Sequence, residues 1–260
     1  MQPLRDLVPP QARPSALRAA LAELAAQDDL ERGAVFTRPE VVAALLDLAG
    51  YTDDRPLYQW SLLEPSFGAG DFLLPAVDRL LAACARAQLD PDDGLRRLHA
   101  AVRAVEIHPA SFDATREALR ARLLAFGANS RIATRLCDAW LVRDDFLLTP
   151  ITGPFDVVVG NPPYVRQERI AAPLLAEYRR RYRTIYDRAD LYIPFFERGL
   201  HLLRDGGRLA FICANRWLKN KYGGPLRGLI AREYHLSHYI DMEGTDPFQS
   251  SVIAYPAITV

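Results

Sequence analysis

The stretch FDVVVGNPPYVRQE, residues 155–168, joins the most strand-like run of the chain to a loop that cannot continue a strand. Its apolar first part predicts a buried strand over residues 155–160. Two consecutive prolines follow, and neither has a backbone N–H to donate to a neighbouring strand. The strand must therefore end here, with the Asn161 side chain, the Pro162 carbonyl and the Tyr164 ring held in a rigid loop just beyond it.

Short apolar runs alternate with helical patterns along the whole chain. The expected strands are residues 60–64, 101–106, 139–142, 155–160, 207–214, 236–242 and 254–260. The expected helices are residues 15–30, 37–49, 71–87, 111–125, 173–183, 190–203 and 223–232. This alternation predicts an α/β fold with a mostly parallel, doubly wound sheet. Ligands of such sheets bind beyond the carboxyl ends of the strands, so the loops after the strands should carry the chemistry.

The best-marked helix begins within the sequence FTRPE, residues 36–40. Thr37 is expected to cap it, with Glu40 completing a capping box three residues later. Phe36 and Val41 are spaced as a hydrophobic staple, and Gly50 is expected to stop the helix.

The composition excludes several classes of protein. The chain has 260 residues, with 32 basic and 32 acidic side chains, so any contact with nucleic acid must come from local patches. Its three cysteines form neither a zinc pattern nor a disulfide framework, which favours a cytoplasmic protein with reduced thiols and no metal. No stretch approaches the ~20 apolar residues that a membrane span needs, and no signal peptide is recognisable.

Three successive strand ends carry residues that suit an adenosine-bearing cofactor. Gly68 and Gly70 allow a tight turn close to a ligand, and the absent third glycine argues against NAD. Glu106 can accept hydrogen bonds from both ribose hydroxyls. Asp145 can accept from an adenine amino group, and Phe146 can cover the ring. Each feature also has an ordinary structural interpretation, and the series of three is what favours a cofactor pocket.

The fourth loop, NPPY, suits a planar substrate with an –NH₂ group. The Asn161 side-chain oxygen and the Pro162 carbonyl are two fixed acceptors, and Tyr164 offers a flat face. Accepting both amino hydrogens aims the nitrogen lone pair at an electrophile and stabilises the positive charge that develops. The loop therefore predicts chemistry at an amino group.

With these motifs in this order, residues 31–260 resemble the class I, S-adenosylmethionine-dependent DNA adenine methyltransferases. More narrowly, they resemble the gamma-type modification enzymes and the methylase parts of fused type IIG restriction–modification proteins. The resemblance implies a Rossmann-like sheet of about seven strands, the last antiparallel, with helices on both faces. It also implies S-adenosyl-L-methionine as cofactor and a helical lead-in over residues 1–30.

The resemblance carries site residues over by motif. Cofactor contacts are assigned to Phe36, Thr37, Glu64, Ser66, Gly68, Gly70, Glu106, Asp145, Phe146 and Asn161. The catalytic motif is assigned to Asn161, Pro162, Pro163 and Tyr164. Phe248 is assigned to the neighbourhood of an adenine extruded from double-stranded DNA.

A basic segment follows the catalytic loop. EYRRRYRTIYDR, residues 177–188, interleaves five arginines with Tyr178, Tyr182 and Tyr186. These side chains are predicted to bind phosphates beside the extruded base. A solvent-exposed helix face without a DNA partner would have a similar sequence pattern. The candidate DNA contacts are Arg166, Arg179, Arg180, Lys219 and Lys221, together with Tyr164 and Phe248.

Three other functions remain open at this point. A protein glutamine methyltransferase also uses an NPPY loop, because a carboxamide poses the same chemical problem. A non-catalytic DNA-binding subunit of a defence complex is possible, and amino methylation of cytosine is less favoured. In the family, a DNA-reading domain follows the catalytic core, and we expect that domain and any restriction endonuclease partner, fused or separate, to lie outside these 260 residues.

Overall fold

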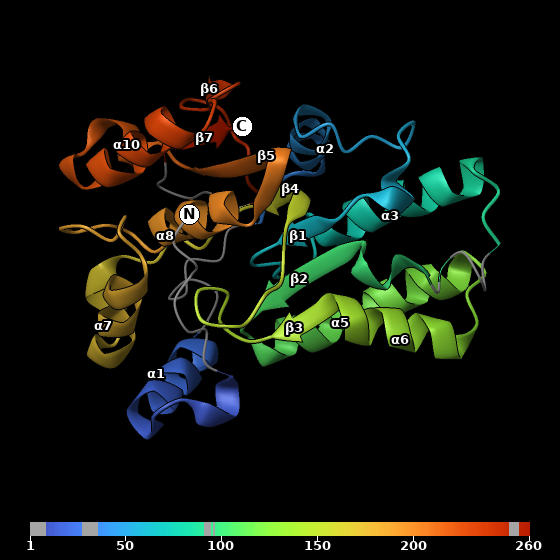
Figure 1. Cartoon of the computed structure of the whole chain (residues 1–260), viewed down its shortest axis with the longest axis horizontal. Coiled ribbons are helices and arrows are strands. Elements are labelled where there is room, and N and C mark those ends of the chain that lie inside the picture. Colours follow the sequence, from blue (N-terminus) through green and yellow to red (C-terminus); the bar gives the residue numbers. More distant parts are fainter. Residues whose placement is uncertain (1–8, 28–35, 91–94, 96, 250–254) are drawn as a thin grey trace.

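The computed structural model describes residues 9–27, 36–90, 95, 97–249 and 255–260 (Figure 1). Within them lies a seven-stranded sheet in the order β3-β2-β1-β4-β5-β7-β6. The strands are β1 (Leu62–Glu64), β2 (Val102–Glu106), β3 (Leu141–Arg143), β4 (Phe155–Gly160), β5 (Leu203–Ala214), β6 (Tyr239–Asp241) and β7 (Pro256–Thr259). All neighbouring strands are parallel except β7, which runs antiparallel to β5 and to β6. The predicted fold class is confirmed.

Helices cover both faces of the sheet. They are α1 (Ser15–Ala26), α2 (Pro39–Leu48), α3 (Leu73–Arg86), α5 (Pro109–Ala125), α6 (Ser130–Trp140), α7 (Ala172–Arg181), α8 (Tyr192–His201), α9 (Arg216–Lys219) and α10 (Gly224–Glu233). Helices α2, α3, α5 and α6 share one apolar core with Val157 and Val159 of β4. Helices α1, α7, α8 and α10 share the other core with Val158, because successive side chains of a strand face opposite sides.

Helix α6 was missing from the sequence prediction. Asn129 caps it by accepting a hydrogen bond from the Ile132 N–H at 3.0 Å. Residues 139 and 140, which were expected to begin a strand, form its last turn, and β3 starts only at Leu141. The apolar run there is shared between a helix end and a short strand, so its strand-like composition was misleading. Residues 28–30 of the first predicted helix lie outside the described residues.

The predicted cap of α2 is wrong, although its predicted end is right. The N-cap is Arg38, with Pro39 in the first helical position and no side-chain capping bond. Thr37 lies one residue earlier and its side chain is used elsewhere, as described below. Gly50 adopts a left-handed φ of 72° just after the helix, as a helix-stopping glycine does.

The parallel arrangement brings the loops after β1, β2, β3 and β4 to one edge of the sheet, because the carboxyl ends of parallel strands lie together. No helix in the described parts of the chain has both the length and the apolar character needed to cross a membrane.

Candidate active site

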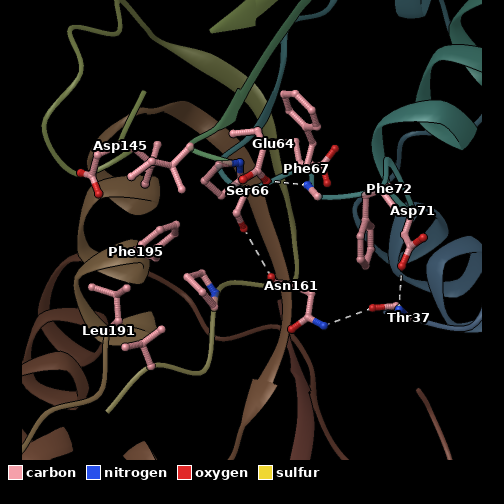
Figure 2. Close-up of a pocket in the computed structure, with 18 of the residues that line it drawn as sticks. Thr37, Glu64, Ser66, Phe67, Asp71, Phe72, Asp145, Asn161, Leu191 and Phe195 are labelled. Carbon is pink, nitrogen blue, oxygen red and sulfur yellow. Dashed lines mark hydrogen bonds between the residues drawn. The ribbon is translucent and has the colours of Figure 1, made fainter. Parts of the chain in front are cut away.

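The four strand-end loops enclose a pocket (Figure 2). Most of the predicted cofactor and catalytic residues line it: Phe36, Thr37, Glu64, Ser66, Gly68, Glu106, Asp145, Phe146, Asn161 and Pro163. Gly70, Pro162 and Tyr164 are not among its lining residues. Thr37 and Asp145 lie on opposite sides of the pocket (Figure 2). Residues that are far apart in the sequence are thus assembled as their motifs predict.

Two positions of the turn after β1 require glycine for different reasons. Gly68 has a φ of 50° and its Cα faces open space, so the backbone lies bare against the pocket. Gly70 has a φ of 88°, and a Cβ there would lie 2.9 Å from the side chains of Leu74 and Thr115. Gly68 therefore serves the pocket, whereas Gly70 serves the packing beneath it.

Glu106 fixes the glycine turn. Its Oε2 accepts a hydrogen bond from the Gly68 N–H at 2.8 Å, and its Oε1 accepts from the His108 N–H at 2.7 Å. Both carboxylate oxygens are thus engaged by backbone N–H groups, and the side chain lines the pocket. His108 itself caps α5 by accepting from the Ser111 N–H through Nδ1 at 3.2 Å. His108 therefore has a structural role.

Asp145 presents a buried carboxyl to the pocket. Its Oδ2 accepts a hydrogen bond from the Tyr178 hydroxyl at 2.6 Å. Its Oδ1 is buried and makes no hydrogen bond with any residue that the structure describes. Burial raises the pKa of Asp145 to about 6, because the charged form loses its hydration. The neighbouring Phe146 ring packs against Phe195 of α8, with ring centroids 5.0 Å apart.

We expect ligand affinity to fall as the pH drops through about 6. An amino group donates to Asp145 only while the carboxyl is ionised, and the raised pKa brings protonation into this range. Binding of S-adenosylhomocysteine should lose up to about tenfold per pH unit below 6. Calorimetry between pH 5 and 8 measures this. The inosine analogue is the control, since its oxo group accepts from the protonated acid and its binding should not weaken in the same way.

Two further carboxyls lie on the pocket wall. Glu64 is 1% exposed, and its Oε2 has no hydrogen-bond partner among the described residues. Burial raises the pKa of Glu64 well above its usual value, and the negative charges of Asp71 and Glu106 raise it further. Asp71 accepts the Thr37 N–H at 2.8 Å, and burial raises its pKa too. A positively charged ligand group would offset the cost of this buried negative charge.

Thr37 orients the Asn161 side chain. The Asn161 Nδ2 donates to Thr37 Oγ1 at 3.2 Å, and this bond turns Oδ1 away from Thr37 (Figure 2). The Ser66 hydroxyl lies 3.4 Å from the Asn161 backbone carbonyl, to which it donates. The amide is thus tied to two other loops of the pocket, which fixes the direction of its oxygen.

Tyr164 of the NPPY loop and Phe248 are in contact. Their rings pack edge to face with centroids 6.2 Å apart, and Tyr192 lies 6.4 Å from Tyr164 on another side. Phe248 is 3% exposed and pairs with Thr37 through an isolated antiparallel bridge. Burial raises the pKa of the Tyr164 hydroxyl well above its usual value, so this group stays neutral.

The prediction for the basic segment is wrong for two of its tyrosines. Tyr178 and Tyr182 are at most 1% exposed and belong to the core, whereas Tyr186 is 46% exposed. Arg180 forms a hydrogen-bonded ion pair with Glu177. Arg180 also lines a hollow beside the first half of β5. Leu174 and Tyr178 form the buried face of α7, and Tyr182 is its C-cap. Arg179 and Arg180 are exposed.

Other predicted DNA contacts lie near the sheet edge that carries NPPY. Arg166 follows the NPPY loop. Burial raises the pKa of Asp190, and the charges of Arg216 and Arg166 offset part of that rise, so both arginines lie on the Asp190 side of the molecule. Lys219 and Lys221 follow β5, and both are exposed. The Lys219 ammonium lies 4.0 Å from Glu243. Arg179 reaches back to Gln167 after the NPPY loop, where its Nη2 donates to Oε1 at 3.0 Å.

The N-terminal segment contributes to the pocket, which the sequence did not indicate. Leu24 of α1 lines it, together with Asp144. Arg13 donates from both terminal nitrogens to the two Asp144 oxygens at 2.6 Å. Other lining residues missed by the motifs are Asp71, Phe72, Ile107, Leu191 and Phe195. Asp71 follows Gly70 directly, whereas nothing local marks Leu24 or Arg13.

The sheet order and the pocket at its carboxyl edge define a class I methyltransferase fold. A solved structure of a candidate class I S-adenosylmethionine-dependent methyltransferase from Listeria monocytogenes matches with a TM-score of 0.56 and 16% identity, covering 93% of this chain and 64% of the other. At this identity the likeness establishes the fold.

Relatives with higher identity establish the family. The family described as Eco57I restriction-modification methylase matches residues 115–248, and the chain belongs to that family. Type II methyltransferase M.PaeR7I from Pseudomonas aeruginosa is 58% identical over 246 residues, which cover 93% of this chain and 42% of that protein. Type II methyltransferase M.XhoI from Xanthomonas vasicola is 54% identical over 230 residues, 88% of this chain and 42% of that protein. The chain thus spans less than half the length of these relatives.

Proposed function

We propose that this protein methylates the N6 amino group of adenine in double-stranded DNA, as the modification component of a restriction–modification system. The observation that carries the proposal is that Asn161 of NPPY lines the same pocket as the glycine turn, Glu106 and Asp145. A group that accepts from a substrate amino group therefore lies beside residues suited to an adenosine-bearing methyl donor. The type II methyltransferase relatives support DNA as the substrate.

The pocket residues fit S-adenosylmethionine, which would supply an electrophilic methyl group on a sulfonium. Asp145 Oδ1 is a buried acceptor that lacks a partner among the described residues, and it suits the adenine amino group. Glu106 is a carboxylate on the pocket wall at the end of β2, a position that suits the ribose hydroxyls. The buried carboxyl of Glu64, with Asp71 near it, suits the positive charge at the methionine end.

The chain's own residues would then prepare the target nitrogen. Asn161 Oδ1 and the Pro162 carbonyl accept the two amino hydrogens, which favours a pyramidal nitrogen with its lone pair toward the methyl group. As the N–C bond forms, positive charge develops on the nitrogen, and the two oxygens stabilise it before a proton leaves. Tyr164 and Phe248 provide aromatic faces for the extruded base.

Glu106→Ala is expected to weaken cofactor binding by about 1–3 kcal/mol, since a hydrogen-bonding carboxylate is lost from the pocket. The change also removes the acceptor of the Gly68 N–H, so the glycine turn becomes less well fixed. Calorimetry with S-adenosylmethionine measures the affinity. Glu117→Ala, which removes a carboxylate that is 66% exposed, is the matched control. Unchanged affinity in Glu106→Ala would show that the ribose assignment is wrong.

Long-read sequencing tests the reaction. The full-length gene product is expressed in a bacterial host that lacks DNA methylation, and the genomic DNA is sequenced with detection of modified bases. We expect N6-methyladenine at one short sequence. Modified cytosine, or methylation of a protein glutamine with unmodified DNA, would refute the proposal. A non-catalytic DNA-binding subunit predicts no modification at all.

A further inference from the structure

Helix α7 holds the turn that presents Asp145 to the pocket. The Tyr178 hydroxyl donates to Asp145 Oδ2 at 2.6 Å, and the Tyr182 hydroxyl donates to the Leu147 carbonyl at 2.6 Å. Both tyrosines are at most 1% exposed, so both bonds are shielded from water. They differ in one respect: Tyr182 holds the backbone of the turn, whereas Tyr178 holds the side chain that lines the pocket.

The two carboxylate oxygens of Asp145 differ in their hydrogen bonding. Oδ2 already accepts a strong hydrogen bond, and Oδ1 is buried with no partner among the described residues. We propose that Tyr178 is the positioning residue for the cofactor's adenine: its hydroxyl fixes the Asp145 carboxylate so that Oδ1 accepts from the adenine amino group. This inference rests on the proposed function, because it assumes that the pocket holds an adenosine moiety.

Such an arrangement would discriminate between purines. A tyrosine hydroxyl has one hydrogen, and here that hydrogen is committed to Oδ2. The ionised carboxylate has no hydrogen of its own, so Oδ1 can only accept. An adenine amino group satisfies it, whereas the oxo group of hypoxanthine places an acceptor against an acceptor. A site built to bond an amino group rejects an analogue that lacks it, since a buried polar atom is then left unpaired.

The charges around Asp145 make its ionisation sensitive to Tyr178. Its pKa is raised to about 6, because the rise caused by burial and by the charge of Asp144 exceeds the lowering by Tyr178, Arg13 and Arg198. These groups belong to the neighbouring loop, the N-terminal segment, α7 and α8. Removal of the Tyr178 hydroxyl takes away the hydrogen bond to the ionised form, so the carboxyl should protonate at a higher pH.

The experiment compares Tyr178→Phe with Tyr182→Phe in the 260-residue chain. Each variant loses one buried hydroxyl and one hydrogen bond to the same turn, so the two substitutions should lower the folding stability by similar amounts. Affinities for S-adenosylhomocysteine and S-inosylhomocysteine are measured by calorimetry between pH 5 and 8. For Tyr178→Phe we expect the preference for the adenosine compound to fall about tenfold or more, which corresponds to ~1.4 kcal/mol. The pH midpoint at which Tyr178→Phe loses affinity for S-adenosylhomocysteine should be higher than in the wild type.

Tyr182→Phe should keep both the wild-type preference and the wild-type midpoint. If Tyr178→Phe also keeps them, or if both variants change alike, Tyr178 has only a structural role and the inference is wrong. Should Tyr178→Phe fail to fold, a difluorotyrosine at position 178 serves instead. It is a stronger donor, so the midpoint should move to lower pH, and an unmoved midpoint would overturn the inference.

Failure of the cofactor assignment, the part of the proposed function on which this inference rests, gives a different result. In that case the wild-type chain itself does not bind S-adenosylhomocysteine, and no variant needs to be compared. If the wild type binds the adenosine compound and prefers it over the inosine compound, the cofactor assignment stands, and only the role of Tyr178 is then decided by the variants.

Discussion

Asn161→Ala is expected to slow methyl transfer by about 10²–10³-fold and to leave cofactor affinity nearly unchanged. The side-chain oxygen would act on the substrate nitrogen, and its interaction strengthens only as charge develops in the transition state. The Asn161 amide is held by Thr37 at 3.2 Å, so the oxygen is oriented before the substrate arrives. Single-turnover methylation with the full-length protein measures the rate, and calorimetry measures the cofactor affinity.

Asn129→Ala is the control for this experiment. It removes another asparagine side chain, the cap of α6, and should cost ~1 kcal/mol of stability without affecting the pocket. A slow Asn129→Ala variant would mean that lost stability, and not lost chemistry, explains the result at position 161. An Asn161→Ala variant with the wild-type rate would show that NPPY is only a turn.

Arg13→Ala is expected to lower the free energy of unfolding by about 3–5 kcal/mol, because it leaves Asp144 as an uncompensated buried charge. The two side chains of this ion pair are 3% and 9% exposed, so water cannot replace the lost partner. The pair also ties the N-terminal segment to the loop after β3, and both Leu24 and Asp144 line the pocket. We therefore expect weaker cofactor binding along with lower stability.

Denaturant unfolding and calorimetry measure the two effects. Arg18→Ala is the matched control, since Arg18 belongs to α1 and is exposed. A double replacement, Arg13→Met with Asp144→Leu, should recover much of the stability, because two well-packed apolar groups need no charge partner. If Arg13→Ala is as stable as Arg18→Ala, the ion pair contributes little and α1 is held by its apolar contacts.

The strand-end motifs predicted the pocket well because each motif is local. Gly68, Glu106 and Asp145 each lie at the end of a strand or in the loop after it, and a parallel sheet brings such positions together whatever the lengths of the intervening helices. The missed helix α6 also had a local signal. Ile132, Leu136 and Trp140 recur every four residues after the capping Asn129, which is the period of a helix face.

Other features could not be predicted in this way. Arg13 and Asp144 are 131 residues apart, and neither is marked by its neighbours in the sequence. Tyr178 and Tyr182 were misinterpreted because arginines surround them. Leu174 and Tyr178 recur with the helical period on the buried face of α7, and Tyr182, the C-cap of that helix, continues the spacing of four. Composition suggested a DNA surface, whereas the helical period assigns these rings to the interior. Periodicity was the better guide here because burial follows the geometry of the helix.

The pairing of Thr37 with the far end of the chain sets the order in which the site can form during synthesis. Gln249 donates from its backbone to the Phe36 carbonyl and from its side chain to the Thr37 carbonyl, across a separation of 212 residues. A ribosome adds roughly 5–20 residues per second, so this partner is made roughly 10–40 s after Thr37. Until then, the strand-end loops exist without the contact that closes them around Asn161. A nascent chain that has already produced NPPY therefore still lacks a finished catalytic pocket.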